Sequence, residues 1–391
     1  MARIVVSGYM LRFPVPGNVL AYFHYVLGLH RLGHKVVYLE ESGWPYGCYD
    51  PSSREWHDYP AAGLRTVRRL ARETGIDVPF VFVNRETFDC DGATWPEIKS
   101  LLAQADLLIN LGGVCWLEEF KLCGLRVFVD MDPMFTQIGR FGAKVLGDYH
   151  LHFAYGTSIG TPECAVPTLG IDWLPLNPPV VADWWSIPLN VREDAPFTTV
   201  ANWTAYGAVE WNGERYGQKD EEFLRILDLP RRTTWPLELT LSGGEDVAPM
   251  LREAGWRVRD SGEGVGIKID SYRNYIAGSR GEFSVAKNAY VKTRCGWISD
   301  RTVCYLASGL PAVIQDTGRS DRFPERRGVL TFSNIDEAAA AIDSVNRDYA
   351  GHRQAARQLA LQHFHSDVVL SGLLDLAWNR RKIYASVEVA G

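Results

Sequence analysis

The stretch from residue 282 to 318 constrains the fold of this chain more than any other. Short apolar runs and helix signals in it predict a strand, a helix and a second strand, over residues 282–286, 300–307 and 312–314. Ser299 or Asp300 can cap the helix, and Gly309 is typical of its end. Because a strand, loop, helix and strand in this order favour a parallel α/β sheet, the helix N-terminus should point at the carboxyl edge of that sheet.

The loop before this helix is rich in cations. It contains Lys287, Lys292 and Arg294, and Gly296 allows a tight backbone conformation there. Helix N–H groups, the helix dipole and basic side chains all favour anions, so a diphosphate fits such a site. An ordinary strand–helix–strand crossover whose cations face water explains the same pattern, and the residues alone do not decide between the two.

Length and composition limit the broad class of protein. A chain of 391 residues suits two α/β domains, and 46% hydrophobic with 23% charged residues indicates a globular protein. The formal net charge of −6 argues against a nucleic-acid polymer or an anionic membrane as the main partner. Seven cysteines without a CxxC pair, no signal peptide and no apolar run of about 18 residues predict a cytoplasmic protein with reduced thiols.

The N-terminal half begins as a Rossmann-like unit. Residues 3–7 predict a buried strand, 19–32 a helix and 36–39 a second strand. No GxGxxG follows the first strand, so a dinucleotide cofactor is poorly supported. Residues 172–196 are rich in Pro and Trp and lack helical periodicity, so we expect a linker between two domains there.

Three motifs resemble the donor-binding segment of GT-B glycosyltransferases. They are Lys-Thr-Arg-Cys-Gly-Trp-Ile-Ser-Asp-Arg (292–301), Tyr-Leu-Ala-Ser-Gly-Leu-Pro-Ala-Val (305–313) and Gln-Asp-Thr-Gly (315–318). The resemblance is closest to the bacterial group related to the spore-protein, or CgeB-like, glycosyltransferases. The usual GT-B version has a Glu at the helix start that contacts the ribose. This chain has Ser299-Asp300-Arg301 instead, which suggests Asp300 as the substitute.

The resemblance implies an α/β chain of the GT-B class, with two Rossmann-like domains facing each other across a cleft. It implies an acceptor domain, a nucleotide-sugar domain and a final helix that crosses back to the first domain, over residues 1–185, 186–365 and 366–391. It also implies that the donor sits mainly on the second domain.

The donor-binding residues follow from the same resemblance. We expect Lys287 and Arg294 to neutralise the diphosphate, without a metal ion, and Lys219 either joins them or is an ordinary surface lysine. Backbone N–H groups near Gly296, Thr317 and Gly318 should assist. The remaining donor candidates are Trp203, Trp297, Ser299, Asp300 and Arg301. Two of these have alternatives: Trp297 stacks on the base or caps the domain core, and Arg301 binds the donor or pairs with an acid such as Asp316 or Asp321.

Catalytic and acceptor candidates come from the first domain. Asp130-Met131-Asp132 is similar to the DxD metal motif of GT-A enzymes, but two carboxylates make a poor metal site, so no metal is expected. Asp132 is the first candidate for a general base that deprotonates the acceptor, while Asp130 braces the loop. His24 is the alternative base, unless it is an ordinary helix-face histidine. The acceptor candidates are Arg12, Asn18, Gly112 and Gly113.

The predicted function is transfer of a sugar from a nucleotide-diphosphate sugar to an acceptor hydroxyl. The expected acceptor is a small secondary metabolite or a cell-envelope glycan precursor, as in bacterial natural-product biosynthesis, and no cofactor is expected. Two alternatives stay open: a non-catalytic nucleotide-sugar-binding module and a GT-B-like epimerase that needs no acceptor. Turnover excludes the first, and product analysis separates the second.

Overall fold

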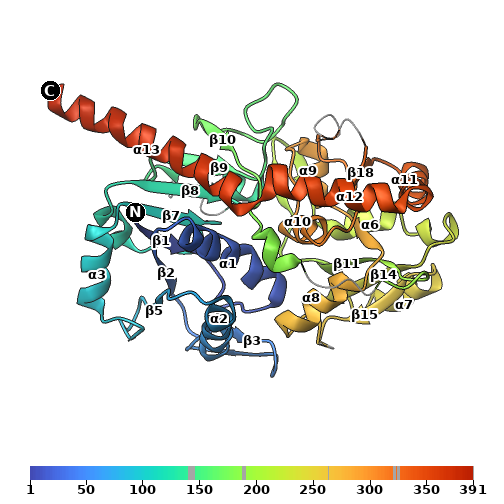
Figure 1. Cartoon of the computed structure of the whole chain (residues 1–391), viewed down its shortest axis with the longest axis horizontal. Coiled ribbons are helices and arrows are strands. Elements are labelled where there is room, and N and C mark those ends of the chain that lie inside the picture. The colour runs from blue at the N-terminus through green and yellow to red at the C-terminus, as the bar shows by residue number, and fades with distance from the viewer. Residues whose placement is uncertain (140–145, 187–190, 263, 320–322, 324–325, 391) are drawn as a thin grey trace.

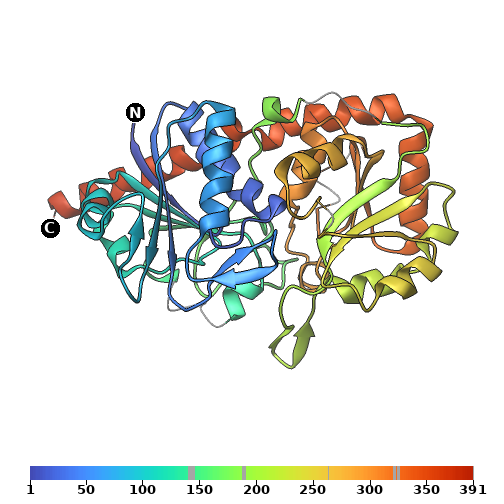
Figure 2. The same ribbon diagram turned by 90° about the horizontal axis from the view of Figure 1, so that it is seen from below.

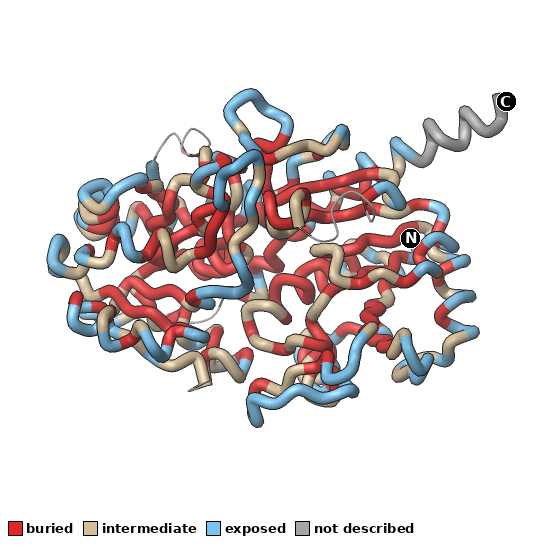
Figure 3. Tube along the Cα trace, turned by 180° about the vertical axis from the view of Figure 1, so that it is seen from behind, coloured by how far each residue is buried: buried red, intermediate tan, exposed pale blue. Residues whose placement is uncertain are grey.

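The computed structural model describes residues 1–139, 146–186, 191–262, 264–319, 323 and 326–390, with side chains as far as residue 380. Two parallel sheets lie in separate halves of the chain, side by side (Figures 1 and 2). Figure 3 shows that the strands of both sheets are largely buried, whereas the connecting loops form most of the exposed surface.

The first sheet has, within the described residues, the strand order β10-β9-β8-β7-β1-β2-β5-β6, and only β5 and β6 pair antiparallel. Its strands are β1 (Arg3–Ser7), β2 (Lys35–Ser42), β5 (Phe80–Asn84), β6 (Cys90–Asp91), β7 (Leu107–Leu111), β8 (Arg126–Asp130), β9 (Leu151–Ala154) and β10 (Trp173–Pro175). The helical segments of this half are α1 (Pro16–Arg31), α2 (Ala61–Thr74), α3 (Trp95–Gln104), η1 (Glu118–Leu122), α4 (Phe135–Ile138) and η2 (Ala182–Trp185). Continuous apolar runs form the central strands because helices cover both faces of the sheet.

The second sheet has, in the described part of the chain, the parallel order β15-β14-β11-β16-β17-β18. Its strands are β11 (Phe197–Asn202), β14 (Leu237–Ser242), β15 (Arg257–Asp260), β16 (Gly281–Ser284), β17 (Ala312–Gln315) and β18 (Val329–Phe332). The helical segments are α6 (Lys219–Arg225), η3 (Leu229–Arg231), α7 (Ala248–Glu253), α8 (Ile269–Ala277), α9 (Asn288–Thr293), α10 (Asp300–Ala307), α11 (Ile335–Arg347) and α12 (Tyr349–Leu359). The predicted strand, loop, helix and strand are therefore β16, α9 with its flanking loops, α10 and β17.

The final helix returns to the first domain, as expected. After the π-helical turn η5 (Ala360–Phe364), α13 (Ser366–Ala390) packs on α1 and extends along the first half (Figure 1). The contact is close at Gly28, where a Cβ atom would stand 2.6 Å from Leu370 and 2.8 Å from Ser366. Glycine is therefore required on α1 for the two helices to approach.

Two hairpins project from the loops. Asn-Gly at 212–213, a strong hairpin signal, forms the turn between β12 (Val209–Trp211) and β13 (Glu214–Tyr216). The second hairpin is the antiparallel pair β3 (Cys48–Asp50) and β4 (Glu55–His57). Arg54 at its turn forms an ion pair with Asp260 of the second domain, at 3.1 Å.

The expected domain boundaries stay predictions. The first sheet ends at Pro175 and the second begins at Phe197, and the expected linker at 172–196 includes residues 187–190, which lie outside the described residues. Among the described helices, none has the length and apolar character that a membrane crossing needs. The cytoplasmic location likewise stays a prediction.

Candidate active site at the junction of the two sheets

The predicted base and a predicted donor residue meet at the junction of the two domains. Asp132 lies in the loop after β8, and Lys287 lies in the loop after β16, 155 residues along the chain. The Lys287 Nζ atom is 2.8 Å from Oδ1 and 2.9 Å from Oδ2 of Asp132, and the hydroxyl of Tyr290 also donates to Oδ1. The carboxyl edges of the two sheets therefore face each other, as the resemblance implied.

Aromatic rings surround the Lys287 ammonium group. It lies 4.4 Å from the ring centre of Tyr206, 4.7 Å from that of Phe135 and 5.3 Å from that of Tyr290. Burial lowers the pKa of Lys287, and the carboxylate of Asp132 opposes that shift. The cation is thus held by one carboxylate and by the faces of rings from both domains.

Asp130 does not reach solvent. It is 0% exposed and accepts hydrogen bonds from the Asp132 N–H at 2.8 Å, the Thr136 hydroxyl at 2.6 Å and the Gln137 amide at 2.8 Å. Burial raises the pKa of Asp130 to about 6, and these three donors limit the rise. The geometry agrees with the interpretation that Asp130 braces the loop that presents Asp132.

Lys219 is a partly buried cation beside two others. It begins α6, and in the described part of the chain it forms no ion pair and no hydrogen bond through its ammonium group. Burial, together with the neighbouring charges of Arg301 and Lys287, lowers the pKa of Lys219 to about 7. A cation in such surroundings favours an anionic ligand.

Arg301 has a structural role. Its three nitrogen atoms donate to Glu282 at 2.7 Å, to the Val200 carbonyl at 2.6 Å and to the Ser284 hydroxyl at 2.7 Å. The side chain is 8% exposed. An ion pair was one of the two expected roles, but the acid is Glu282 and not Asp316; Asp321 lies outside the described residues.

The start of α10 is capped as predicted. The Ser299 hydroxyl accepts a hydrogen bond from the Arg301 N–H at 3.1 Å. Asp300 is the first helical residue, and burial raises its pKa although Arg301 and Lys219 lower it. A cavity of about 10 Å³ lies between this turn and the ends of β16 and β17, which is room for about one water molecule.

The backbone N–H groups expected to bind a diphosphate are already used, so that prediction is wrong for Gly296 and Gly318. The Gly296 N–H donates to the Thr317 carbonyl at 2.7 Å, and the Gly318 N–H donates to Asp316 at 2.9 Å. Gly296 instead permits contact between the domains, since a Cβ atom there would stand 2.4 Å from the Ser158 hydroxyl. Its φ of +76° also favours glycine.

The cations of the expected loop separate because α9 forms within it. Lys292 pairs with Glu214 of the β12–β13 hairpin at 3.3 Å and donates to the Arg215 carbonyl. Arg294 ends α9 in the left-handed conformation and is exposed, without an ion pair to any described residue. Of these three cations, only Lys287 pairs with Asp132. Arg294 is exposed and can bind a ligand.

The two tryptophans differ in position. Trp297 packs on Tyr290, with ring centres 4.6 Å apart, and its indole N–H donates to the Met131 carbonyl at 3.4 Å. Trp203 is 7% exposed and stacks on Phe223 inside the second core. The prediction that Trp203 contacts the donor is therefore wrong, because core packing uses its ring.

A larger pocket opens next to Lys219. Its volume is about 350 Å³, and its walls are the loop 204–208, Arg215, Gln218 and Asp220. Sequence reasoning missed Gln218 and Asp220, although both flank the predicted Lys219. It also missed Tyr206 and Tyr290, since tyrosines are common and only the fold brings these two to Lys287.

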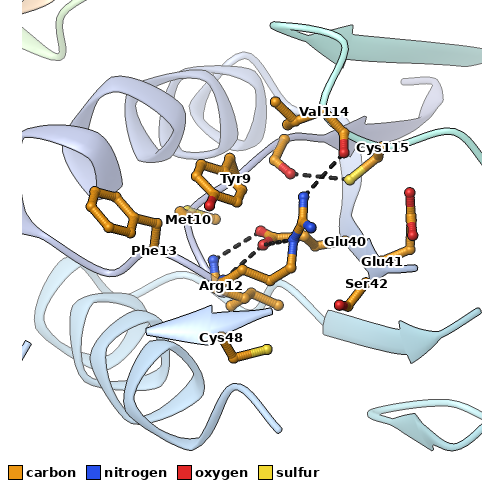
Figure 4. A network of polar contacts seen from close by, with 12 residues as sticks. Tyr9, Met10, Arg12, Phe13, Glu40, Glu41, Ser42, Cys48, Val114 and Cys115 are labelled. Atoms are coloured by element: carbon orange, nitrogen blue, oxygen red, sulfur yellow. Dashed lines mark hydrogen bonds and ion pairs between the residues drawn. The ribbon is translucent and has the colours of Figure 1, made fainter. Parts of the chain in front are cut away.

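Arg12 lies inside the first domain, so the prediction that it contacts an acceptor directly is wrong. Its side chain is 0% exposed, pairs with Glu40 at 3.4 Å and donates to the Val114 carbonyl at 3.0 Å (Figure 4). The guanidinium carbon is 4.7 Å from the ring centres of both Tyr9 and Trp44. Arg12 therefore stabilises the carboxyl edge of the first sheet from inside the domain.

The other acceptor candidates lie at the carboxyl edge of the first sheet. The Asn18 amide donates to the Tyr9 carbonyl at 2.5 Å and to the Phe13 carbonyl at 2.8 Å, so it fixes the loop after β1. Gly112 and Gly113 follow β7 with φ of +72° and +64°. Both are partly exposed, and their contact with an acceptor stays a prediction.

His24 cannot serve as the base in this arrangement, so that alternative is wrong. It is 1% exposed on α1, and its ring nitrogens face the Val181 N–H at 3.2 Å and the Trp185 indole N–H at 3.1 Å. Burial lowers the pKa of His24 to about 3, so the ring is neutral near pH 7. Burial of a helix face is a tertiary property that the sequence did not reveal.

A metal site is not evident where the structure describes side chains: no three His, Cys, Asp or Glu residues come together there in a way that could hold an ion. The expectation of metal-independent chemistry without a cofactor stays a prediction.

Comparison with known proteins places the fold. No protein-family model and no curated sequence matches the chain. Solved structures do: an alpha-glucosyltransferase in complex with UDP-glucose and DNA containing an abasic site (TM-score 0.60, 11% identity) and Anabaena HepE in complex with UDP and glucose (TM-score 0.56, 11% identity). Each match covers 96% of this chain and 99% of the other. AviGT4, a glycosyltransferase involved in avilamycin A biosynthesis, matches at TM-score 0.53 and 14% identity, over 96% of this chain and 97% of its own.

These matches correct one expectation. Three of the similar structures are alpha-glucosyltransferase complexes with DNA. The inference that a nucleic-acid polymer is not a partner is therefore contradicted. It rested on the net charge of −6, which sums over the whole chain and says nothing of how charge is distributed around one site.

The matches cover 96% of the chain and therefore both of its halves, and the proteins they involve include glycosyltransferases. The chain therefore has the GT-B fold, with the carboxyl edges of its two parallel sheets meeting at Asp132 and Lys287.

Proposed function

We propose that this chain is a glycosyltransferase that moves a sugar from a nucleotide-diphosphate sugar to an acceptor hydroxyl. The GT-B fold supports this, because the similar structures include glycosyltransferases and complexes with UDP or UDP-glucose. The charges at the junction support it independently, since cations from the second domain surround a place where the two sheets meet.

The single observation that carries the proposal is the position of Lys219. Its ammonium group interacts with the charges of Arg301 and Lys287 and, more weakly, with those of Asp300 and Glu282, and no described carboxylate forms an ion pair with it. A cation that is desolvated and next to like charges is costly, so it is expected where an anionic ligand completes the site. A diphosphate between Lys219 and Lys287 supplies that anion.

In the proposed reaction, Asp132 takes the proton of the acceptor hydroxyl, whose oxygen forms a bond to the anomeric carbon. The bond from that carbon to the diphosphate breaks, and the nucleoside diphosphate leaves with the electron pair. Lys219 and Lys287 stabilise its charge without a metal ion. Asp132 is bound by Lys287 in the free protein, so the diphosphate must compete with it for that ammonium group.

For the acceptor, we propose a small metabolite or a glycan precursor, in keeping with the resemblance to the bacterial CgeB-like group. A second candidate is a hydroxyl group on DNA. It is favoured by the near full-length likeness to alpha-glucosyltransferase complexes with DNA, one of which contains an HMU base. The two candidates differ in the size of the surface that must approach the junction.

The first experiment is thermal stabilisation by UDP, GDP, dTDP and their sugar conjugates. About 100 Kd of ligand adds roughly 2.7 kcal/mol to the unfolding free energy, which is easily detected. We expect stabilisation by one nucleotide and its loss in Lys219→Met, with Lys292→Met as a matched control that keeps it. If every nucleotide fails at millimolar concentration, the proposal is wrong.

Turnover then separates the enzyme classes. Mass spectrometry of the preferred donor with hydroxylated metabolites, a glycan precursor pool and DNA containing an HMU base should detect one glycosylated product. Binding without any product indicates a non-catalytic module. An isomerised nucleotide sugar formed without acceptor indicates an epimerase.

A further inference from the structure

The pocket beside Lys219 contains polar atoms that lack partners. Gln218 is 4% exposed, and its amide nitrogen Nε2 forms no hydrogen bond to any described group. The Oδ1 atom of Asp220 is buried and also unbonded. Both residues line the pocket of about 350 Å³. Each buried polar atom without a partner costs free energy, and of the eleven such atoms in the described chain these two belong to residues in the wall of this pocket, so the pair indicates a ligand.

The chemistry of the wall selects the kind of ligand. An amide N–H is a donor and a carboxylate is an acceptor, which together suit hydroxyl groups, since a hydroxyl both donates and accepts. Asp220 disfavours an anion in this space. The only cation in the wall among the described residues, Arg215, is already paired with Glu221. An uncharged polyhydroxylated group therefore fits better than a phosphate.

The shape and position agree with a sugar. The volume lies at the lower end of the roughly 300–1,000 Å³ of small-molecule sites. Ala205, Gly207 and Ala208 leave space in the loop wall. Tyr206 belongs to this wall and also contacts Lys287, which holds the candidate base Asp132. A group bound here thus shares the Tyr206 side chain with Lys287, next to the candidate base.

We propose that this pocket binds the sugar of the donor, with Gln218 donating to one sugar hydroxyl and Asp220 accepting from another. These two residues then determine which sugar is transferred. The inference rests on the proposed function, because that function places the diphosphate on Lys219. In the sequence, Lys219 lies between Gln218 and Asp220. It adds a subsite and a selection rule to that function.

The test compares each nucleoside diphosphate with its sugar conjugate. Calorimetry gives Kd for UDP and UDP-glucose, GDP and GDP-mannose, and dTDP and dTDP-glucose, and the pair with the largest gain from the sugar is used. In Gln218→Met and in Asp220→Asn, we expect that gain to fall roughly tenfold or more, while the Kd of the nucleoside diphosphate stays unchanged. Asp228→Asn, a surface carboxylate paired with Arg231, is the control.

Each other outcome overturns the inference in a recognisable way. If both variants keep the gain, the pocket does not hold the sugar, and the proposed function stands. If they weaken the nucleoside diphosphate and its conjugate equally, the pocket holds the nucleotide. If the sugar adds no affinity in the wild type, no sugar subsite exists. If no nucleotide binds at all, the proposed function itself fails. Asp220→Asn replaces one carboxylate oxygen by an amide nitrogen and keeps the shape of the side chain, so a folding defect in Gln218→Met does not remove the test.

Discussion

The two sheet edges that meet at the junction differ in how their polar side chains are hydrogen-bonded and paired. On the first, Asp130 accepts three hydrogen bonds, and Glu40 accepts from Leu11, Arg12 and Tyr38. On the second, Lys219 forms no ion pair with a described residue, and Gln218 and Asp220 each keep a buried atom unbonded. The edges differ in their cations and not in every polar atom, since Glu41 Oε2 and Asn110 Oδ1 on the first edge are also buried and unbonded. The first edge pairs its buried cation Arg12 with Glu40, whereas the second leaves the cation Lys219 without a described pair.

The difference suggests a division of work. The three hydrogen bonds that Asp130 accepts fix the loop after β8 without a ligand, so this edge is suited to present one reactive group, here Asp132. An edge with unpartnered cations and polar atoms gains stability only when a ligand binds. On this view the second domain binds the donor by charge, and the first positions the base. Variants on each edge should therefore fail in different measurements.

The largest effect is expected for Asp132→Asn. The amide cannot take the proton of the acceptor, so kcat should fall by about 10²- to 10⁴-fold, with no loss of donor affinity. Steady-state kinetics with the preferred donor measures this. Asp91→Asn, which removes a carboxylate paired with Arg68, should behave as the wild type. Near-normal turnover in Asp132→Asn would remove Asp132 from the mechanism.

Arg12→Met should damage folding and leave donor binding intact. It leaves Glu40 buried without its cation, and breaking such a pair costs roughly 3–5 kcal/mol of unfolding free energy. Urea denaturation measures the loss. Arg12→Met combined with Glu40→Gln should recover part of it, because the neutral amide no longer needs a counter-charge. If the binding free energy of the nucleotide falls by more than the unfolding free energy, Arg12 contributes to ligand binding and not only to the fold.

Lys219→Met should show the opposite pattern. Nucleoside diphosphate affinity should weaken by about 10- to 100-fold, as expected for a charge-assisted contact. Stability without ligand should not decrease, since the change removes a desolvated cation that lies beside Arg301 and Lys287. Titration calorimetry and urea denaturation give the two values. Lys292→Met is again the matched control, and a destabilised protein with normal affinity would reverse the assignment of this edge.

The smallest effect is proton uptake on nucleotide binding. The pKa of Lys219 is lowered to about 7, so at pH 8 about nine-tenths of the side chains are neutral, and a bound anion raises that pKa. Binding at pH 8 should take up about 0.9 proton, falling at pH 6, where Lys219 is already charged. Calorimetry in buffers of different ionisation enthalpy counts the protons. Lys219→Met should lose this uptake at pH 8; if it does not, another group is responsible.

The fold was largely predictable, because apolar runs and caps are local signals. The strands near residues 3–7 and 312–314 and the Ser299 cap appear where the pattern placed them. The segment predicted as a cationic loop also contains the helix α9, which was not predicted because its residues give no strong helix signal. The antiparallel pair β3–β4 was missed, because its segment has no two-residue turn motif.

The site was predictable only in part. Asp132 and Lys287 follow strand ends, and strand ends can be read from a sequence. The misassigned residues, Arg12, His24 and Trp203, share one property: each is buried by elements distant in sequence. Burial turns a plausible ligand contact into a packing or pairing role, and no local pattern reports it. The pairing of Arg301 with Glu282 likewise depends on how α10 packs against β16, which the sequence does not report.

The pairing of Lys287 with Asp132 has a consequence for the kinetics. While the ammonium group holds the carboxylate, an acceptor that arrives first meets a base whose lone pairs are occupied. In the proposed reaction, the diphosphate competes for Lys287, and donor binding would release Asp132 from that ammonium group. Substrate addition should then follow a compulsory order, donor before acceptor. In initial-rate measurements, the nucleoside diphosphate product would compete with the donor and give mixed inhibition against the acceptor.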